Sequence, residues 1–471
     1  MKLEINEMWS INNANIDIGK INIIGGNNST GKSTTSKLLY CFLKSGTEYG
    51  KNLVIWDITK QIDEFLRRVN KFFGRETYEE MKEIVEPITY PGSFHPIMKE
   101  NVSIEEVSDV YDKLIEALRY GLSRIKISKS QYDALKKMKL QNTNQNDELL
   151  LKGVNVTYND STAKVDNGLV FIIEEFVNVG SIISLMENEP FKLYEATIKK
   201  LFKAEFNITK FNDPETYVKW CGDGFSYCIH NDKENKELKL SAEGEYEFKT
   251  VHYLDSFSIL DTKMERIATE HTDSLKKDIQ SIHSESNKVF DEEFNRKTKK
   301  LEETINQILH GKIEYEGDQY KYSSEDGVNS SMINTASGIK QIGIIQLLLS
   351  NRKLKPGSFF IVDEPEVNLH PEWQIKLSQI LVLLASELNV IVYINSHSPF
   401  VMEALSLYSE YYGIINDANF YLTEKDEEKK GKYNMNKIEH DEINKIYDNL
   451  GRPYDILDEV RIDLEMGLTE R

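Results

Sequence analysis

Residues 25–34 read GGNNSTGKST, between an apolar segment and a helical pattern that begins at Lys32. The pattern Gly26-x-x-x-x-Gly31-Lys32-Ser33 within this stretch is that of a phosphate-binding loop. Its glycines let the backbone curl so that successive N–H groups, together with the N-terminus of the next helix, point at phosphate oxygens. A glycine-rich turn that merely enters a helix is the alternative, and the strand-loop-helix context favours phosphate binding over it.

The loop predicts a specific set of nucleotide contacts. Lys32 is expected to reach the β- and γ-phosphates and to assist catalysis, and the Ser33 hydroxyl is expected to bind Mg²⁺. The predicted ATP-binding residues are Gly26, Asn27, Asn28, Ser29, Thr30, Gly31, Lys32, Ser33 and Thr34. ATP and Mg²⁺ are therefore the predicted ligands.

A second stretch, VDEPEVNLHPEWQ at 362–374, follows the apolar run 359–362 and opens with three carboxylates and a histidine within eight positions, Asp363, Glu364, Glu366 and His370. It could form a metal site, a general acid–base pair or one part of a nucleotide site. The apolar run suits a buried strand, so Asp363 would emerge at the carboxyl edge of a sheet, where open α/β folds bind ligands. This predicts Asp363 as a Mg²⁺ ligand and Glu364 as the residue that orients or deprotonates the attacking water. Two solvated turn carboxylates are the alternative, and Glu366 stays unassigned.

Two further segments carry polar residues that such a site needs. Ser337 and Gly338 open a predicted helix before Asp363, as an anion-binding helix N-terminus would. His397 follows a predicted strand in the stretch NSHSPF. A histidine after a strand is usually incidental, but its position beyond the acidic stretch favours a contact with the γ-phosphate.

Taken in order, the phosphate loop, the Ser-Gly helix opening, the Asp-Glu pair and the late histidine resemble an ABC-type ATPase head. The motif sequences are most similar to those of the SMC-like and OLD-like (overcoming lysogenization defect) branch, which includes ATPases of bacterial anti-phage systems. The motifs cover residues 1–45 and 310–410. The resemblance implies an α/β fold: a P-loop ABC-ATPase head with a mixed sheet flanked by helices, plus a large helical and β-hairpin insertion.

The resemblance also implies a role for each matching residue. Ser337 and Gly338 would act in trans, on the ATP of a second protomer, and Asn368 and His370 would lie in a D-loop at the dimer interface. Glu364 would be the catalytic glutamate and His397 the switch histidine. The signature reads ASGIKQ rather than LSGGQ. No glutamine matches the family's coupling loop: Gln61 lies in a different context, and Asp255, after the strand pattern TVHYL, is a weak substitute.

Six segments are predicted along the chain. They are an N-terminal part of the head (1–50), a mainly helical insertion (51–215), a β-hairpin subdomain of the head (216–260), a helical arm (261–310), the C-terminal part of the head (311–412) and an α/β tail (413–471). The alternation of helical and strand patterns between 338 and 408 predicts a largely parallel sheet. The arm is predicted because 262–310 is rich in charge and lacks Gly and Pro.

The overall composition indicates which kinds of binding partner and which cellular compartment to expect. The net charge of −19 repels nucleic acid, so nucleic-acid binding would need a local basic patch, and the run 296–300 is either such a patch or a solvated helix face. No apolar run approaches the roughly 18 residues that span a bilayer, and the N-terminus lacks a secretory pattern, so no membrane partner is expected. Three cysteines without a C-x-x-C pair suit the reducing cytoplasm.

Three functions remain open at this point. The first is an ATPase that forms a homodimer or higher homo-oligomer around ATP and regulates a separate effector, a nuclease or toxin, in anti-phage defence. No nuclease motif is recognisable in the chain, which is why the effector is expected to be a separate protein. The second is an SMC-like or RecF-like ATPase of DNA repair or chromosome maintenance. The third, a scaffold that binds ATP without hydrolysing it, is disfavoured because Glu364 and His397 are both present.

Overall fold

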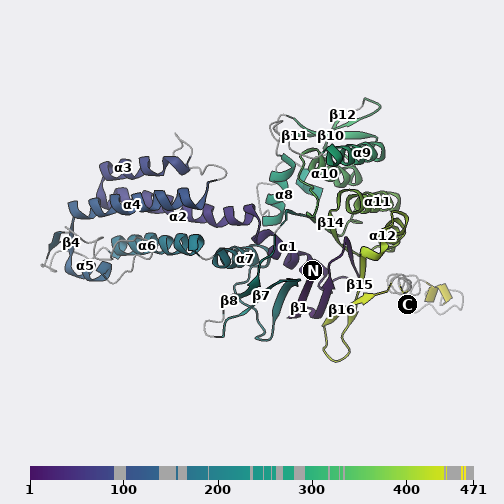
Figure 1. The fold of residues 1–471 in the computed structure, drawn as a ribbon, viewed down its shortest axis with the longest axis horizontal. Helices are drawn as coiled ribbons and strands as arrows, with labels where there is room; N and C mark the ends of the chain where they lie inside the picture. Colours follow the sequence, from purple (N-terminus) through teal and green to yellow (C-terminus); the bar gives the residue numbers. More distant parts are fainter. Residues whose placement is uncertain are drawn as a thin grey trace, which may run out of the picture. The chain divides into compact units, whose positions relative to one another are not determined.

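The computed structural model describes residues 1–89, 102–136, 155–157, 167–188, 190–233, 237–247, 249–255, 257–260, 269–280, 292–316, 319–327, 329–332, 335–439, 442, 458–459 and 461–462. The chain forms two compact units, one made of residues 1–47 and 198–471 and the other of residues 48–197. Figure 1 shows the helices and strands of each unit.

The first unit is built on an eleven-stranded sheet with the order β8-β7-β6-β1-β2-β16-β15-β3-β14-β13-β9. Its strands are β1 (Lys2–Met8), β2 (Ile11–Asp17), β3 (Ile21–Gly25), β6 (Tyr217–Gly222), β7 (Phe225–Asn231), β8 (Leu238–Gly244), β9 (Val251–Leu254), β13 (Phe359–Asp363), β14 (Ile391–Ser396), β15 (Ala418–Lys425) and β16 (Tyr433–Ile438). Strands β15, β3, β14, β13 and β9 run parallel to one another. The strands on the β1 side pair antiparallel, so the predicted mixed sheet is confirmed.

The register of the parallel strands brings their ends to one edge. Asp363 of β13 lies opposite Asn395 of β14, and Ser396 lies opposite Gly25 of β3. Residues from three distant parts of the chain therefore leave the sheet at the same level, which is where open α/β folds place their ligands.

Helices cover both faces of this sheet. The helices of this unit are α1 (Lys32–Ser45), the end of α7 (Pro190–Phe206), α8 (Glu270–Gln280), α9 (Glu292–Leu309), α10 (Ser337–Ser350), α11 (Pro371–Leu388) and α12 (Pro399–Tyr411), of which α9 packs on α10 and α11. Along β14 the side chains alternate, since Tyr393 bonds Thr35 of α1 at 2.6 Å while Val392 and Ile394 join the core cluster of α10, α11 and α12. Each aliphatic side chain buried in this way contributes about 1.5–3 kcal/mol.

The described helices of the segment predicted as a helical arm pack against the rest of the first unit. Leu275 of α8 and Leu301 and Ile305 of α9 belong to the same buried cluster as α10 and α11, so the described helices pack on the head. A three-stranded sheet follows, formed by β10 (Gly311–Glu316), β11 (Gln319–Ser324) and β12 (Asn329–Ser331). The amphipathic spacing of α9 provides the reason, because one apolar face of a charged helix suffices to bury it against a neighbour.

The segment from 413 onward also differs from the predicted tail. Strand β15 pairs with β3, and β16 pairs with β2, so residues 418–438 lie in the middle of the main sheet. Their alternating apolar residues, such as Phe420 and Leu422, are buried in the core. The part of the tail beyond 439 falls almost wholly outside the described residues.

The second unit is helical. It contains α2 (Glu48–Phe73), α3 (Arg75–Val85), α4 (Ile104–Arg124), α5 (Lys129–Lys136), α6 (Asn167–Asn188), the start of α7 and a short two-stranded sheet of β4 (Lys126–Ser128) and β5 (Asn155–Thr157). Phe65 of α2 stacks on Phe176 of α6 with ring centroids 4.0 Å apart, and α4 begins with a capping box between Ser103 and Glu106. Helix α6 ends at Asn188, and α7 begins at Pro190.

Within the described part of the chain, no helix combines the length and the apolar character that a bilayer span requires.

Candidate nucleotide-binding site

The phosphate loop leaves β3 and enters α1 at Lys32. Its backbone requires glycine at two positions, because Gly26 has a φ of 144° and Gly31 a φ of 98°. A Cβ on Gly26 would also lie 1.8 Å from Thr423 Oγ1, and one on Gly31 would lie 2.5 Å from Ile11 Cγ1. The neighbouring strands β15 and β2 therefore fix the loop from outside. No side chain caps the N-terminus of α1, so its first N–H groups suit an anion.

Lys32 lies across the loop that precedes it. Its ammonium donates to the carbonyls of Gly26 at 3.0 Å and Asn27 at 2.7 Å. Burial lowers the pKa of Lys32 to about 8, although the carboxylates of Glu364 and Asp363 act in the opposite direction. A buried ammonium beside carboxylates at a helix N-terminus is well placed to hold phosphate.

Asp363 sits at the end of β13 within a set of hydrogen bonds. Asn395 donates to its Oδ1 at 2.8 Å and Tyr253 to its Oδ2 at 3.1 Å, and the Ser33 side chain also bonds it. Burial raises the pKa of Asp363, and these three donors lower it in part. Asn395 in turn donates to Ser36 of α1 at 2.6 Å. The two predicted Mg²⁺ ligands, Ser33 and Asp363, thus lie in direct contact.

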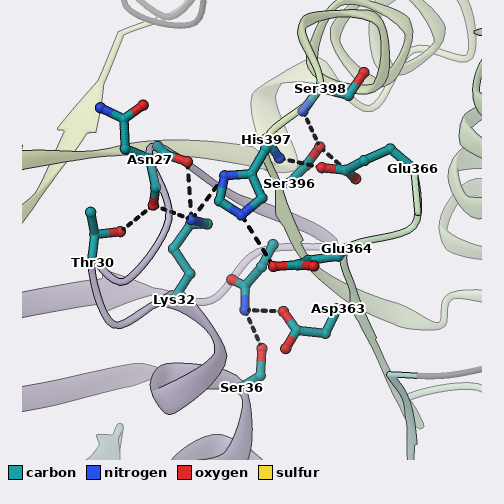
Figure 2. A network of polar contacts seen from close by, with 12 residues as sticks. Asn27, Thr30, Lys32, Ser36, Asp363, Glu364, Glu366, Ser396, His397 and Ser398 are labelled. Carbon is teal, nitrogen blue, oxygen red and sulfur yellow. Dashed lines mark hydrogen bonds and ion pairs between the residues drawn. The ribbon is translucent and has the colours of Figure 1, made fainter. Parts of the chain in front are cut away.

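Figure 2 shows that Lys32, His397 and Glu364 form one chain of contacts. Lys32 Nζ lies 3.3 Å from His397 Nδ1, and His397 Nε2 lies 3.1 Å from Glu364 Oε1. An ammonium can only donate, so Nδ1 is the acceptor and Nε2 carries the proton that bonds Glu364. The backbone of Glu364 has a φ of 50°, an unusual conformation held by a bond from its N–H to Asn395 O at 2.9 Å.

Glu366, which the sequence left unassigned, anchors the loop that carries His397. One carboxylate oxygen accepts the Ser396 hydroxyl at 2.9 Å, and the other accepts the backbone N–H of His397. Burial raises the pKa of Glu366, and the bond from the His397 N–H opposes that rise. Figure 2 shows this carboxylate on the far side of His397 from Lys32.

The Ser-Gly opening of α10 packs against the turn that follows Glu364. The Ser337 hydroxyl donates to the carbonyl of Asn368, whose φ is 59°. Gly338 is buried against Trp373, where a Cβ would lie 2.9 Å from the indole ring. The two segments predicted at a dimer interface therefore form one continuous surface of the same protomer.

His370 takes a structural position at the start of α11. Its Nδ1 accepts the N–H of Glu372 at 3.4 Å, and His370 is the N-cap of the helix. Asp363 and Glu364 lie at the other end of the turn. No group of three or more His, Cys, Asp or Glu residues in the described ranges could hold a metal ion, so the acidic stretch is not one metal site made only of these residue types.

A buried ionic cluster beside the site was missed by the sequence reading. His271 of α8 bonds Glu205 Oε2 through Nδ1 at 2.7 Å and Asp255 Oδ2 through Nε2 at 2.9 Å. The side chains of His271 and Glu205 are fully buried. Burial lowers the pKa of His271, but the two carboxylates raise it to about 9, so the ring is a cation at neutral pH. The contacts span three separate segments, and only the motif near Asp255 gave any signal.

Asp255 reaches the nucleotide edge of the sheet. It follows β9, the neighbour of β13, and it lines a cavity of about 150 Å³ together with Asp363, Glu364 and Gln341. Two oxygens in this region, Gln341 Oε1 and Asn395 Oδ1, are buried and have no hydrogen-bond partner among the described residues. Oxygen atoms in this setting fit a hydrated cation and phosphate oxygens.

A glycine-rich loop before α1, a carboxylate pair ending β13 and a histidine ending the strand between them define a P-loop ATPase fold. The chain belongs to the AAA ATPase domain family, whose model matches residues 1–402. The resemblance to ATPase heads that the four motifs suggested is therefore confirmed.

Solved structures similar to this chain are SMC head domains. The one from Thermotoga maritima is 12% identical, covers 48% of this chain and 73% of its own, and has a TM-score of 0.28. The head with an extended coiled coil from Pyrococcus furiosus, bound to the C-terminal domain of ScpA, is 10% identical with 98% of both chains covered and a TM-score of 0.32. The head with a coiled coil and joint from Pyrococcus yayanosii is 11% identical, covers 96% and 99%, and has a TM-score of 0.34. No curated protein matches the chain. The family assignment rests on the family model.

Proposed function

We propose that this protein is a Mg²⁺-dependent ATPase that dimerises around ATP and acts as a regulatory switch for a separate effector. The observation that carries the ATPase proposal is the chain of contacts from Lys32 through His397 to Glu364, which starts at the phosphate loop and ends at a carboxylate. A protein that only binds ATP needs the loop but not a base aligned with it.

Each residue has a distinct task in this proposal. Lys32 and the N–H groups of the loop bind the phosphates, while Ser33 and Asp363 hold Mg²⁺, which neutralises charge on the phosphate oxygens when bound. Glu364 accepts the proton of the attacking water. His397 holds Glu364 in place through its Nε2 proton. Through its contact with Lys32 it responds to the presence of the γ-phosphate. Asp255 is a weak substitute for the family's coupling glutamine, and no coupling residue is assigned in this proposal.

Dimerisation is supported by the surface that joins Ser337 to Asn368. Gly338 lies buried beside Ser337 against Trp373, and the exposed His370 follows Asn368 in the same turn. In the proposed dimer Ser337 and Gly338 cover the ATP held by the partner protomer, and Asn368 and His370 lie along the interface. The helix N-terminus of α10 then supplies partial positive charge to that phosphate.

Ser337→Arg tests this interface. The large, positively charged arginine side chain is expected to prevent the second protomer from docking. Turnover is then expected to fall at least about tenfold, a loss of about 1.4 kcal/mol of transition-state stabilisation. A single protomer is expected still to bind ATP. Steady-state phosphate release, equilibrium nucleotide binding and mass photometry measure the three effects. Ser350→Arg is the matched control, because it makes the same change at the exposed far end of α10. Equal loss of ATP binding and turnover in Ser337→Arg would show that Ser337 acts within its own protomer.

The effector is proposed to be a nuclease or toxin of a bacterial anti-phage system, by analogy with the motifs of the OLD-like branch. The three cysteines of the chain are free thiols, as expected in the cytoplasm.

A DNA-repair or chromosome-maintenance ATPase is the alternative function, and it predicts that DNA stimulates turnover. The net charge of −19 disfavours such stimulation, and the exposed Arg296, Lys299 and Lys300 lie on the solvent face of α9. Turnover measured with and without duplex DNA at two salt concentrations separates the readings.

A further inference from the structure

Glu366 is a partly buried carboxylate for which the proposed chemistry has no use. It accepts the Ser396 hydroxyl and the His397 N–H, so it bonds two consecutive residues of the loop that ends β14. Glu366 itself stands at the start of the turn that leads to Asn368. The carboxylate thus joins two loops that are separate in sequence and that carry different parts of the proposed site.

A second bridge joins the same two loops. The Ser398 hydroxyl donates to Gln374 Oε1 at 2.6 Å, and Gln374 Nε2 donates to the carbonyl of Leu369 at 3.0 Å. Ser396 Oγ also accepts the N–H of Ser398 at 3.0 Å. Gln374 and Ser398 are both buried, so water competes little for these bonds.

The turn between the two bridges is itself stiff. The N–H of Leu369 donates to the carbonyl of Glu366 at 3.0 Å, and Asn368 between them has a positive φ. Asn368 also accepts the Ser337 hydroxyl. A movement of Asn368 is therefore expected to move Glu366 as well, because a single hydrogen-bonded turn connects the two residues.

We propose that Glu366 is a positioning residue that transmits contact at the turn 366–370 to His397. When a partner protomer presses on Asn368 and His370, the Glu366 carboxylate sets the backbone of His397, and the imidazole ring then holds Glu364 in line for hydrolysis. This inference rests on the proposed ATP-bound dimer. It deepens that function by naming the route along which dimer formation controls turnover.

The chemistry of the contact suits this task. A carboxylate that accepts a backbone N–H and a hydroxyl makes two charge-assisted hydrogen bonds, which are stronger than neutral ones. Both are directed at the main chain and side chain next to the ring, so they fix the orientation of His397 without touching the reacting atoms. Lys32 and Glu364 contact the ring from its other sides.

The test is a double-mutant cycle between Glu366 and His397 on the full chain. Glu366→Ala is expected to lower kcat for ATP about tenfold or more, with KM for ATP and ATP-driven dimerisation unchanged. In a His397→Ala background the same change is expected to have no further effect, because the residue acts through the ring. Glu366→Gln keeps one acceptor for the His397 N–H and is expected to recover most of the activity.

Glu372→Ala is the matched control, since Glu372 is an exposed carboxylate in the first turn of α11 that pairs with Lys376 at 2.9 Å. Ser396→Ala removes one donor and leaves the carboxylate, so it tests the same route should Glu366→Ala fail to fold. Additive effects of Glu366→Ala and His397→Ala on kcat overturn the proposal, and so does loss of dimerisation in Glu366→Ala. A wild-type chain that neither hydrolyses ATP nor dimerises refutes the proposed function instead, before the cycle is made.

Discussion

Glu364→Gln is expected to lower ATP turnover by about 10²- to 10⁴-fold, the usual contribution of a general base, while ATP remains bound. Glutamine has the same shape as glutamate, and its Oε1 can still accept the His397 Nε2 proton that lies 3.1 Å from Glu364 Oε1. The backbone bond from residue 364 to Asn395 does not depend on the side chain. The substitution therefore removes the base and leaves the geometry of the site in place.

Because hydrolysis would end the ATP-bound state, this variant is also expected to accumulate as an ATP-bound dimer. Single-turnover phosphate release measures the chemical step, and mass photometry with and without ATP measures the dimer. Glu403→Gln, an exposed carboxylate on α12, makes the same chemical change away from the site and is expected to behave as the wild type. Hydrolysis at the wild-type rate in Glu364→Gln would rule out Glu364 as the base.

The second large effect concerns stability and its dependence on pH. His271 is fully buried between Glu205 and Asp255, and its pKa is raised from 6.5 to about 9. A group whose pKa is higher in the folded state stabilises the fold while it binds its proton. The contribution is complete below pH 6.5, falls as the pH rises toward 9 and is lost above it. At about 1.4 kcal/mol per unit, the difference amounts to about 3–4 kcal/mol.

His271→Asn is expected to remove this contribution and to leave the buried Glu205 with only the more distant cation of Lys37, 3.9 Å from its Oε2, and the loss of a buried ionic partner costs up to about 3–5 kcal/mol at neutral pH. Urea unfolding at pH 6.5, 7.5 and 9 gives the free energy of unfolding of the variant and the wild type. The difference between the two should shrink as the pH rises. His310→Asn is the control, since His310 is exposed and its φ of 52° suits asparagine. A difference independent of pH would mean that folding does not raise the pKa of His271.

Much of the site could be predicted because its motifs are local. The glycines at 26 and 31, the lysine that follows and the strand that ends at Asp363 each reveal their role within a few residues, since backbone conformation and helix polarity depend on near neighbours. The positions of Ser337 and His397 relative to that strand also indicated where they would lie. The structure brings Lys32, Asp363, Glu364 and His397 to one edge of the sheet, as the sequence indicated.

Where the predicted arm and tail pack could not be read from the sequence, for one common reason. Residues 261–310 and 413–471 have no motif, so their helical and strand patterns predict elements without predicting partners. The structure packs Leu301 of α9 into the head core and inserts β15 beside β3. Burial against distant segments decides where an amphipathic helix or an alternating strand lies, and sequence patterns do not report it.

The sequence by itself determined the class of fold and the phosphate-loop pattern, and it predicted which residues would contact a nucleotide, because these patterns depend on short-range backbone geometry. Only the tertiary structure decided the partners of the buried charges: Glu205 with His271, 66 residues apart, and Glu366 with His397, 31 residues apart. A buried charge must find a partner wherever the fold brings one, and that choice depends on the packing of the whole sheet rather than on any stretch of the chain.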